Sequence, residues 1–274
     1  MHNGLDLLDE SALRAALDPQ ALASLRGIHL AREIPSTNQY LLDSARQGLH
    51  GPYACLAEYQ TMGRGRRGNV WVSPFASGLC MSLLWRFERD PRHLAGLSLA
   101  IGVTLAESLE SCGVQGIALK WPNDLYWSGR KLGGLLIELV AQPNGITHCV
   151  IGIGINVRVP VTTLDAVEQP WVDLASTDWN PLPRSHLAGR LLSGVLHTVE
   201  HFETAGLAPF LQAWRDRDWL LGQSVCIEQL DGTVLEGIGA GIEDDGTLRL
   251  DTGGQTVSIV NGHVRLSQNA TQLR

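Results

Sequence analysis

The chain has 274 residues, of which 44% are hydrophobic, and its net charge is −7. This size and composition predict an ordinary buried core, in one large domain or in a large and a small one. The negative charge argues against DNA or RNA binding, which depends largely on cationic contacts to phosphates.

Neither a membrane segment nor a secretory signal is visible in the sequence. Its apolar runs are short, and no basic-then-apolar stretch follows Met1, so we expect a cytoplasmic protein without membrane contacts. The five cysteines are scattered and the nine histidines lack HExxH-type spacing. This pattern predicts reduced thiols and no resident metal site.

Apolar spacing predicts helices and strands that do not alternate strictly. Ser36-Thr37-Asn38 precedes an apolar helical pattern, and its polar side chains can cap a first helical turn. Strands are predicted at residues 54–59, 79–87, 117–127, 131–140 and 148–157, and further helices at 11–17, 19–25, 94–112, 184–202 and 209–218. This order favours an α+β fold, a mixed β-sheet with helices packed against it.

The composition changes after Gly222. Short strand-like runs at 224–229, 233–240, 247–250 and 256–260 are separated by turn signals such as Asp231-Gly232 and Asp245-Gly246. About 45 residues of this kind predict a small β-barrel. We therefore expect two domains, residues 1–221 and 222–274.

A Gly/Arg loop, Gly63–Gly68 with the sequence GRGRRG, lies between two predicted strands. Glycine lets the backbone approach a ligand closely, and arginine supplies permanently charged donors for phosphate or carboxylate oxygens. Trp71 follows with a flat surface that suits a ring. A solvated basic loop is the plainer interpretation, but the flanking buried strands favour a lid that an anion would order.

Lys120 and Lys131 are the only lysines among 21 basic residues. Lys120 lies in an apolar strand, where an unpaired ammonium would be costly, so an anion should meet it. An internal ion pair with Asp124 is the alternative. All other basic residues are arginines. The two lysines are therefore either retained by chance or required at positions where a compact ammonium group is needed.

Gly152 and Gly154 alternate with isoleucine on a predicted buried strand, which would leave a slot against bare backbone that ends at Asn156. Neither GxGxxG nor GxxxxGK[ST] is present. No Ser/His/Asp arrangement or cysteine nucleophile is apparent either. The pattern favours electrostatic catalysis of phosphoryl or nucleotidyl transfer.

Five segments in this order resemble the bacterial biotin–protein ligases. They are Ser36-Thr37-Asn38, EYQ-x-x-GRGRRG-x-x-W, KWPND, RK-L-x-G-L-L-I-E and GIGIN, which cover residues 36–156. Each motif is weak alone, whereas five at matching spacing are specific. A later segment, residues 205–214, and the small C-terminal barrel extend the likeness, and the family's class II synthetase-like catalytic fold with an SH3-like barrel becomes the expected fold.

The resemblance implies a two-step reaction. The biotin carboxylate attacks the α-phosphate of Mg·ATP, giving biotinyl-5′-AMP and pyrophosphate. A lysine of a biotin carboxyl carrier protein, the carrier of acetyl-CoA carboxylase, then attacks the acyl carbon and releases AMP. The implied substrates are biotin and ATP, with Mg²⁺ accompanying ATP, and a homodimer is possible in this family.

The resemblance also implies roles for individual residues. Lys120 and Arg66 would be catalytic, Lys120 by bridging the biotin carboxylate and the α-phosphate. The implied biotin contacts are Ser36, Thr37, Asn38, Gln60, Gly63, Arg64, Gly65, Arg66, Ser82, Lys120, Gly152 and Gly154. The implied ATP contacts are Arg66, Trp71, Lys120, Lys131 and Asn156, with Trp71 on the adenine.

Three departures from the family pattern matter. Asn69 and Val70 stand where some members have basic residues, so pyrophosphate would be held less tightly. Arg265 is shifted relative to the C-terminal arginine that reaches ATP in some members, and no role is assigned to it. The thirty residues before the first motif are too few for a winged helix, so we expect no DNA binding. A lipoate or octanoate ligase and a non-catalytic biotin sensor remain the alternatives.

Overall fold

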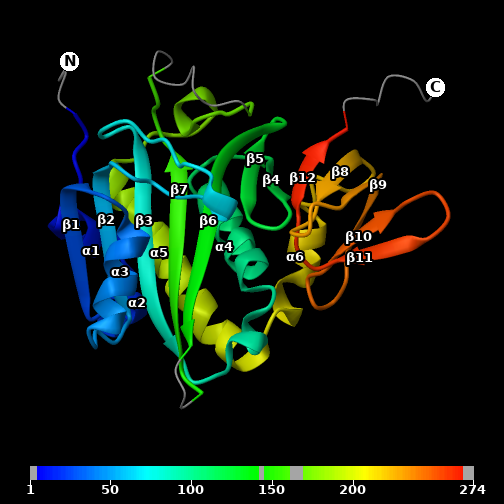
Figure 1. Cartoon of the computed structure of the whole chain (residues 1–274). Helices are drawn as coiled ribbons and strands as arrows, with labels where there is room; N and C mark the ends of the chain where they lie inside the picture. Colours follow the sequence, from blue (N-terminus) through cyan, green and yellow to red (C-terminus); the bar gives the residue numbers. More distant parts are fainter. Residues whose placement is uncertain (1–4, 142–144, 161–168, 268–274) are drawn as a thin grey trace.

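A computed structural model describes residues 5–141, 145–160 and 169–267 of the chain. Its main layer is a seven-stranded sheet in the order β1-β2-β3-β7-β6-β5-β4 (Figure 1). β1 runs parallel to β2 and every other neighbouring pair is antiparallel, so the predicted mixed sheet is confirmed. The strands are β1 (Gly27–Ile34), β2 (Tyr53–Gln60), β3 (Gly78–Phe87), β4 (Ile117–Lys120), β5 (Asp124–Trp127), β6 (Arg130–Ala141) and β7 (Thr147–Asn156).

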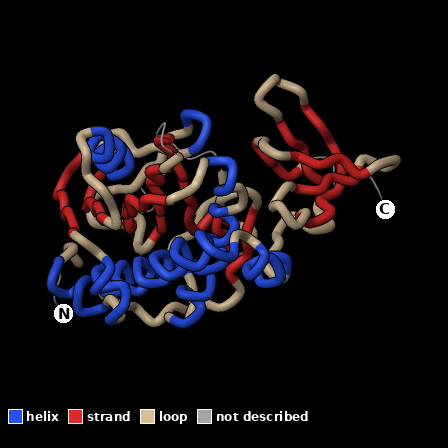
Figure 2. The backbone as a smooth tube through the Cα atoms, turned by 90° about the horizontal axis from the view of Figure 1, so that it is seen from below, coloured by secondary structure: helices blue, strands red, loops and turns tan. Residues whose placement is uncertain are grey.

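Helices cover the two faces of this sheet unequally. The long helices α4 (Leu97–Ser111) and α5 (Arg184–Ala205) lie across one face, and α1 (Glu10–Ala16) and α2 (Pro19–Ser24) pack on α5 (Figure 2). The opposite face carries α3 (Thr37–Arg46), which contacts β2, β3 and β7. Part of this second face is therefore not covered by helices, and a ligand could bind there.

The start of α3 lies where the capping pattern predicts it. Ser36 has extended backbone geometry, and its hydroxyl accepts a hydrogen bond from the amide of Gln39. Leu41, Leu42 and Ala45 are buried against the sheet. This local capping and packing fix the helix N-terminus, and with it the predicted site residues of the first turn.

The expectation that no stretch could span a bilayer needs correction. By length and composition alone, the helical segment Pro91–Ser111 is long and apolar enough to cross a membrane. Its residues are mostly buried, and α4 contacts α5 as well as β4 and β6. Its apolar character is explained by this position in the protein core.

The strands predicted from the sequence differ from those of the structure at two places. The run 117–127 is divided into β4 and β5, because residues 121–123 form a turn that brings Lys120 opposite Asp124. β1 was not predicted, because residues 1–30 read as helix-prone. Its pattern of burial is irregular, and its pairing with β2 is a tertiary contact.

The C-terminal region is confirmed as β-rich, in an antiparallel five-stranded sheet ordered β11-β10-β9-β8-β12. It contains β8 (Ser224–Glu228), β9 (Val234–Ile242), β10 (Leu248–Asp251), β11 (Thr256–Ile259) and β12 (His263–Leu266), the last not predicted. Helix α6 (Leu211–Arg215) precedes it, and one hydrophobic core cluster includes residues of both sheets. The Trp121 indole also donates to the Gly246 carbonyl across the junction, and the domain boundary near Gly222 stays a prediction.

Candidate active site

A cavity of about 800 Å³ lies on the α3 side of the large sheet. Its wall comes from the first turn of α3, the Gly/Arg loop, the β4–β5 turn, β6, β7 and the C-terminal strand β12. Among the described residues, six basic side chains line it against one carboxylate, that of Asp124; the six are Arg64, Arg66, Arg67, Lys120, Lys131 and Arg265. An acidic protein thus concentrates positive charge in one hollow, which favours an anionic ligand.

Three glycines form part of the cavity floor. Gly134 on β6 pairs with Gly154 on β7, and Gly152 lies two residues further along the same strand. A β-carbon at Gly152 would lie 2.3 Å from Asn38 Oδ1, and one at Gly154 would lie 2.5 Å from Trp71 Cε2. The predicted glycine slot therefore exists, and in this structure side chains of the site lie directly on it.

A polar cluster occupies the α3 end of the cavity. Gln60 Oε1 accepts hydrogen bonds from the Thr37 amide at 2.8 Å and from the Thr37 hydroxyl at 3.1 Å. Ser82 Oγ lies 2.7 Å from Thr37 Oγ1. These groups alternate donors and acceptors within one cluster, which suits a neutral polar ring such as a cyclic urea.

Asn38 is committed to the protein itself. Its amide nitrogen donates to the Leu136 carbonyl at 3.1 Å and to Glu138 Oε2 at 2.9 Å. Its carbonyl oxygen lies 2.6 Å from the Ser82 hydroxyl, which donates to it. Asn38 lines the cavity, but both of its side-chain amide atoms are engaged within the protein, and its predicted contact with biotin stays untested.

The Gly/Arg loop is closed by its own backbone. The Gly65 amide donates to the Asn69 carbonyl at 2.7 Å, and the Trp71 amide donates to the Gly63 carbonyl at 3.0 Å. Arg67 adopts a left-handed φ of 56° at the turn. These bonds place Trp71 at the base of the loop, against the glycine floor.

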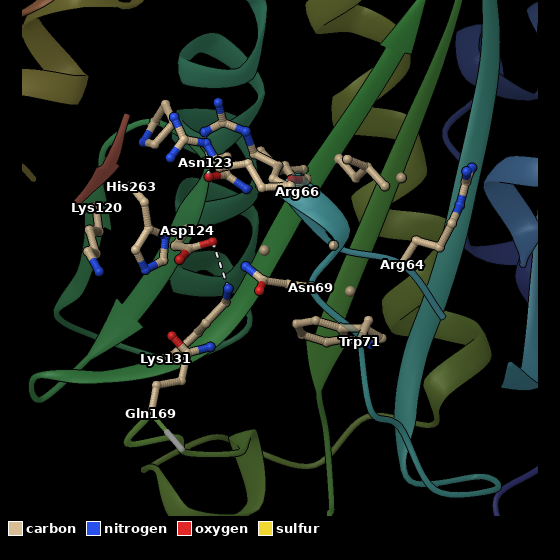
Figure 3. A pocket seen from close by; sticks show the side chains of 18 of the residues that line it. Arg64, Arg66, Asn69, Trp71, Lys120, Asn123, Asp124, Lys131, Gln169 and His263 are labelled. Carbon is tan, nitrogen blue, oxygen red and sulfur yellow. Dashed lines mark hydrogen bonds and ion pairs between the residues drawn. The ribbon is translucent and has the colours of Figure 1, made fainter. Parts of the chain in front are cut away.

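The three arginines of this loop point to different partners. Arg64 Nη2 lies 2.7 Å from Glu138 Oε2, and Arg67 Nη1 donates to the Glu228 carbonyl of β8 at 3.0 Å. Arg66 donates to Asn123 Oδ1 at 3.2 Å, and burial lowers the pKa of its guanidinium, which still stays charged. Figure 3 shows Arg64 and Arg66 extending in opposite directions.

Lys131 occupies the middle of the cavity. Its ammonium forms an ion pair with Asp124 Oδ1 at 2.8 Å and lies 5.9 Å from the centre of the Trp71 ring (Figure 3). Both side chains of the pair are largely buried. The alternative ion pair of Lys120 with Asp124 is not formed: the two residues face each other in the β4–β5 register, but the Asp124 carboxylate pairs with Lys131.

Lys120 lies beside the aromatic rings of Tyr126 and Trp219. Its ammonium is 3.3 Å from the Tyr126 hydroxyl, 5.3 Å from the Tyr126 ring and 5.8 Å from the Trp219 ring. Burial lowers the pKa of Lys120; Asp124 opposes this shift, whereas Lys131 and Arg265 add to it. No carboxylate of residues 5–141, 145–160 or 169–267 lies within ion-pair distance of it, so an anionic ligand would find this charge available.

Of the site residues predicted from the sequence, three do not line the cavity in the described part of the chain. Ser82 lies behind Thr37 and Asn38. Gly63 is at the base of the loop, where a β-carbon would lie 2.3 Å from the Trp71 carbonyl oxygen. The side-chain nitrogen Nδ2 of Asn156 donates a hydrogen bond to the Val172 carbonyl at 3.0 Å. The predicted contact of Asn156 with the nucleotide would require this bond to change.

The structure brings to the site three residues to which the sequence assigned no role, Arg265 among them. Asn123 lines the cavity beside Arg66, and His263 and Arg265 enter from β12. Burial lowers the pKa of His263, and Arg265, Lys120 and Arg67 add to the effect. The alternation of polar and apolar side chains along His263–Leu266 could have revealed the last two, because it indicates a fifth short strand with Arg265 on one face.

Comparison with known proteins gives a consistent result. Residues 30–156 match the biotin/lipoate A/B protein ligase family. The chain is 38% identical over 262 residues to the bifunctional ligase/repressor BirA of Escherichia coli (strain K12), covering 96% of this chain and 79% of that protein. It is 33% identical over 274 residues to the biotin–[acetyl-CoA-carboxylase] ligase of Mycobacterium tuberculosis, covering 94% and 98% of the two chains.

A solved structure shows the same fold. The biotin protein ligase from Aquifex aeolicus in complex with biotin and ATP matches with a TM-score of 0.72 at 24% identity. The match covers 88% of this chain and 100% of that chain. At this identity the likeness concerns the arrangement of the backbone.

Proposed function

Because this chain belongs to the biotin/lipoate A/B protein ligase family, we propose that it is a biotin–[acetyl-CoA-carboxylase] ligase. It activates biotin with ATP and transfers the biotinyl group to a lysine of the biotin carboxyl carrier protein. In the first step a biotin carboxylate oxygen bonds to the α-phosphorus and pyrophosphate leaves. In the second step the carrier amine, after losing a proton, bonds to the acyl carbon and AMP leaves.

The charge of the cavity carries this proposal. Among the described residues, six basic side chains and one carboxylate line the same hollow as the neutral polar cluster of Thr37 and Gln60. Such a cavity can take a molecule with a neutral polar head, an apolar body and an anionic end, together with a polyphosphate. Preorganised cations stabilise the charge that develops during nucleotidyl transfer.

The order of residues along the cavity bears on the two lysines. Asn38 of the first turn of α3 meets the backbone of Gly152, Trp71 meets Gly154 two residues away, and Lys131 lies 5.9 Å from the Trp71 ring, whereas Lys120 lies beside Trp219. A ligand whose head binds at the cluster would present its carboxylate near Lys131. This favours Lys131 for the carboxylate and Lys120, with Arg66, for the phosphates, which shifts the bridging role first expected of Lys120.

We expect Trp71 and Asp124 to interact with the nucleotide and its metal ion. Trp71 would exchange its contact with Gly154 for one with adenine when both substrates bind. ATP enters with Mg²⁺, a hard cation that prefers oxygen ligands and is usually held by one or two carboxylates together with phosphates. Asp124, the one carboxylate among the described lining residues, fits this requirement if Lys131 turns to the substrate.

The remaining expectations stay predictions: cytoplasmic location, no DNA binding, and a possible homodimer through a sheet edge. β1 and β4 are the edge strands of the large sheet. Size-exclusion chromatography with and without biotin and ATP tests the dimer. A shift to twice the mass would support it.

Incubation with a biotin carboxyl carrier protein, biotin and Mg·ATP tests the enzymatic function. Intact-mass measurement should show one biotinyl adduct on the carrier, and omission of ATP should abolish it. Octanoate and lipoate, offered in place of biotin, should give no adduct. Binding of biotin without any adduct would instead support the non-catalytic sensor.

A further inference from the structure

The Gly/Arg loop is attached to the protein by two of its arginines. Arg64 pairs with Glu138 of β6, and Arg67 bonds to the backbone of Glu228 of β8, while Arg66 faces the cavity. The guanidinium of Arg64 is directed away from Lys131 and Asp124 in Figure 3. Its present role is therefore to hold the loop.

Glu138 has a second partner. The same carboxylate oxygen, Oε2, accepts from Arg64 Nη2 at 2.7 Å and from Asn38 Nδ2 at 2.9 Å. Asn38 is 4% exposed and lies on the bare backbone of Gly152, with its carbonyl oxygen bonded to Ser82. One oxygen atom thus joins the loop to the residues behind the polar cluster.

The exposure of this pair suits a contact that opens and closes. The Arg64 and Glu138 side chains are 37% and 27% exposed. An ion pair at this depth is weak, because water screens it, whereas a fully buried pair would open rarely. The Asn38 end is buried and fixed, so Glu138 provides a stationary anchor to which Arg64 can return.

We propose that Glu138 is a positioning residue whose ion pair with Arg64 retains the acyl-adenylate beneath the Gly/Arg loop. The inference rests on the proposed ligase function and goes beyond it by assigning Arg64 to retention instead of direct ligand contact. Asn38 orients the Glu138 carboxylate, and the carboxylate holds Arg64 and with it the loop. Loss of the pair lets the loop open more often, so the adenylate escapes.

The test measures how long the adenylate stays bound. Arg64→Gln, Glu138→Gln and the double variant are loaded with biotin and α-³²P-ATP, and release of labelled biotinyl-AMP is followed after an unlabelled chase. Each single variant should release it about two- to fivefold faster than the unmodified protein, the range expected for a partly exposed ion pair. The double variant should release it no faster than the single ones, since both remove the same contact.

Arg14→Gln is the matched control. Arg14 is also 37% exposed and pairs with Glu10 at 2.7 Å, but it lies on α1, away from the cavity wall. Its release half-life should equal that of the unmodified protein. Arg64→Gln leaves Glu138 and Asn38 intact, so it carries the test even if Glu138→Gln folds poorly.

The outcomes separate the two proposals. An unchanged half-life in Arg64→Gln, or effects that multiply in the double variant, would overturn the retention role while the ligase function stands. An unmodified protein that forms no biotinyl-AMP would overturn the ligase function itself, and with it the retention role.

Discussion

The indole of Trp71 lies directly on the backbone of Gly154, where a β-carbon would come within 2.5 Å of indole Cε2. The indole nitrogen is buried and has no hydrogen-bond partner among residues 5–141, 145–160 and 169–267. Trp71 thus occupies the slot that the glycine opens, without a polar bond that would fix it there. A ring held only by packing can give way to a ligand.

Alanine at the floor glycines should weaken biotin binding. Gly152→Ala would place its β-carbon 2.3 Å from Asn38 Oδ1, and Gly154→Ala would collide with Trp71. The added methyl group would also fill the slot in which we expect biotin to bind, and an overpacking cost of about 1–3 kcal/mol in the complex would raise the dissociation constant for biotin about fivefold to a hundredfold. Isothermal titration calorimetry measures it.

Gly254→Ala is the control for these variants, because a β-carbon there meets nothing within 4 Å. It should bind biotin as the unmodified protein does. Equal affinity in Gly152→Ala or Gly154→Ala would show that the slot is not part of the biotin site.

Removal of either lysine should slow adenylate formation. Lys120→Ala and Lys131→Ala each delete a preorganised charge, a loss of about 3–4 kcal/mol that lowers the single-turnover rate by two to three orders of magnitude. Because Lys131 lies beside Trp71, whose ring meets the glycine floor, Lys131→Ala should also raise the KM for biotin, whereas Lys120→Ala, beside Trp219, should raise that for ATP. Quenched-flow measurement of pyrophosphate release gives these constants.

The lysine assignment has a clear counter-result. A biotin KM that rises in Lys120→Ala and stays constant in Lys131→Ala would return the carboxylate contact to Lys120. Retention of the full single-turnover rate by either variant would remove that lysine from the mechanism.

Arg66→Gly should release the reactive adenylate. Arg66 is the arginine of the loop that faces Asn123 and the cavity, so its loss removes both charge and closure. Biotin should then appear on lysines of an added bystander protein such as serum albumin, detected by streptavidin blotting. Arg66→Lys, which keeps the charge, should label less, and labelling confined to the carrier would refute the role.

Asp218 should make stability depend on pH. Burial raises the pKa of this carboxyl from 3.8 to about 6, and within the described part of the chain its Oδ2 has no hydrogen-bond partner. Between these pH values the folded state holds the proton more tightly than the unfolded state. The free energy of unfolding therefore falls as pH rises from about 4 to 6, and the loss persists at pH 7.

Asp218→Asn should abolish this fall and stabilise the protein at pH 7 by about 2 kcal/mol, after allowance for partial exposure. The hydrogen bond from the Leu220 amide to Asp218 Oδ1 can be kept by asparagine. Urea unfolding from pH 4 to 8 measures both proteins. Parallel curves for the two would contradict a raised pKa at this position.

The sequence alone determined the features that depend on near neighbours. The cap at Ser36 and the apolar spacing behind it fixed α3, and left-handed Gly113 lies just past the end of α4. These signals are local, because a helix is capped and given a buried face by residues a few positions apart. The glycine slot and the Gly/Arg loop were equally visible, since each is one continuous segment.

Only the tertiary structure decided which of these segments meet. Asp124 is four residues from Lys120 and seven from Lys131, yet it pairs with Lys131 because β5 and β6 bring them together. Glu138 ends the RK-L-x-G-L-L-I-E segment, where the sequence assigned it no role, and it joins Asn38 and Arg64 because β6 brings its carboxylate to both side chains. Pairing between distant segments depends on strand register and on loop closure, which local composition does not encode.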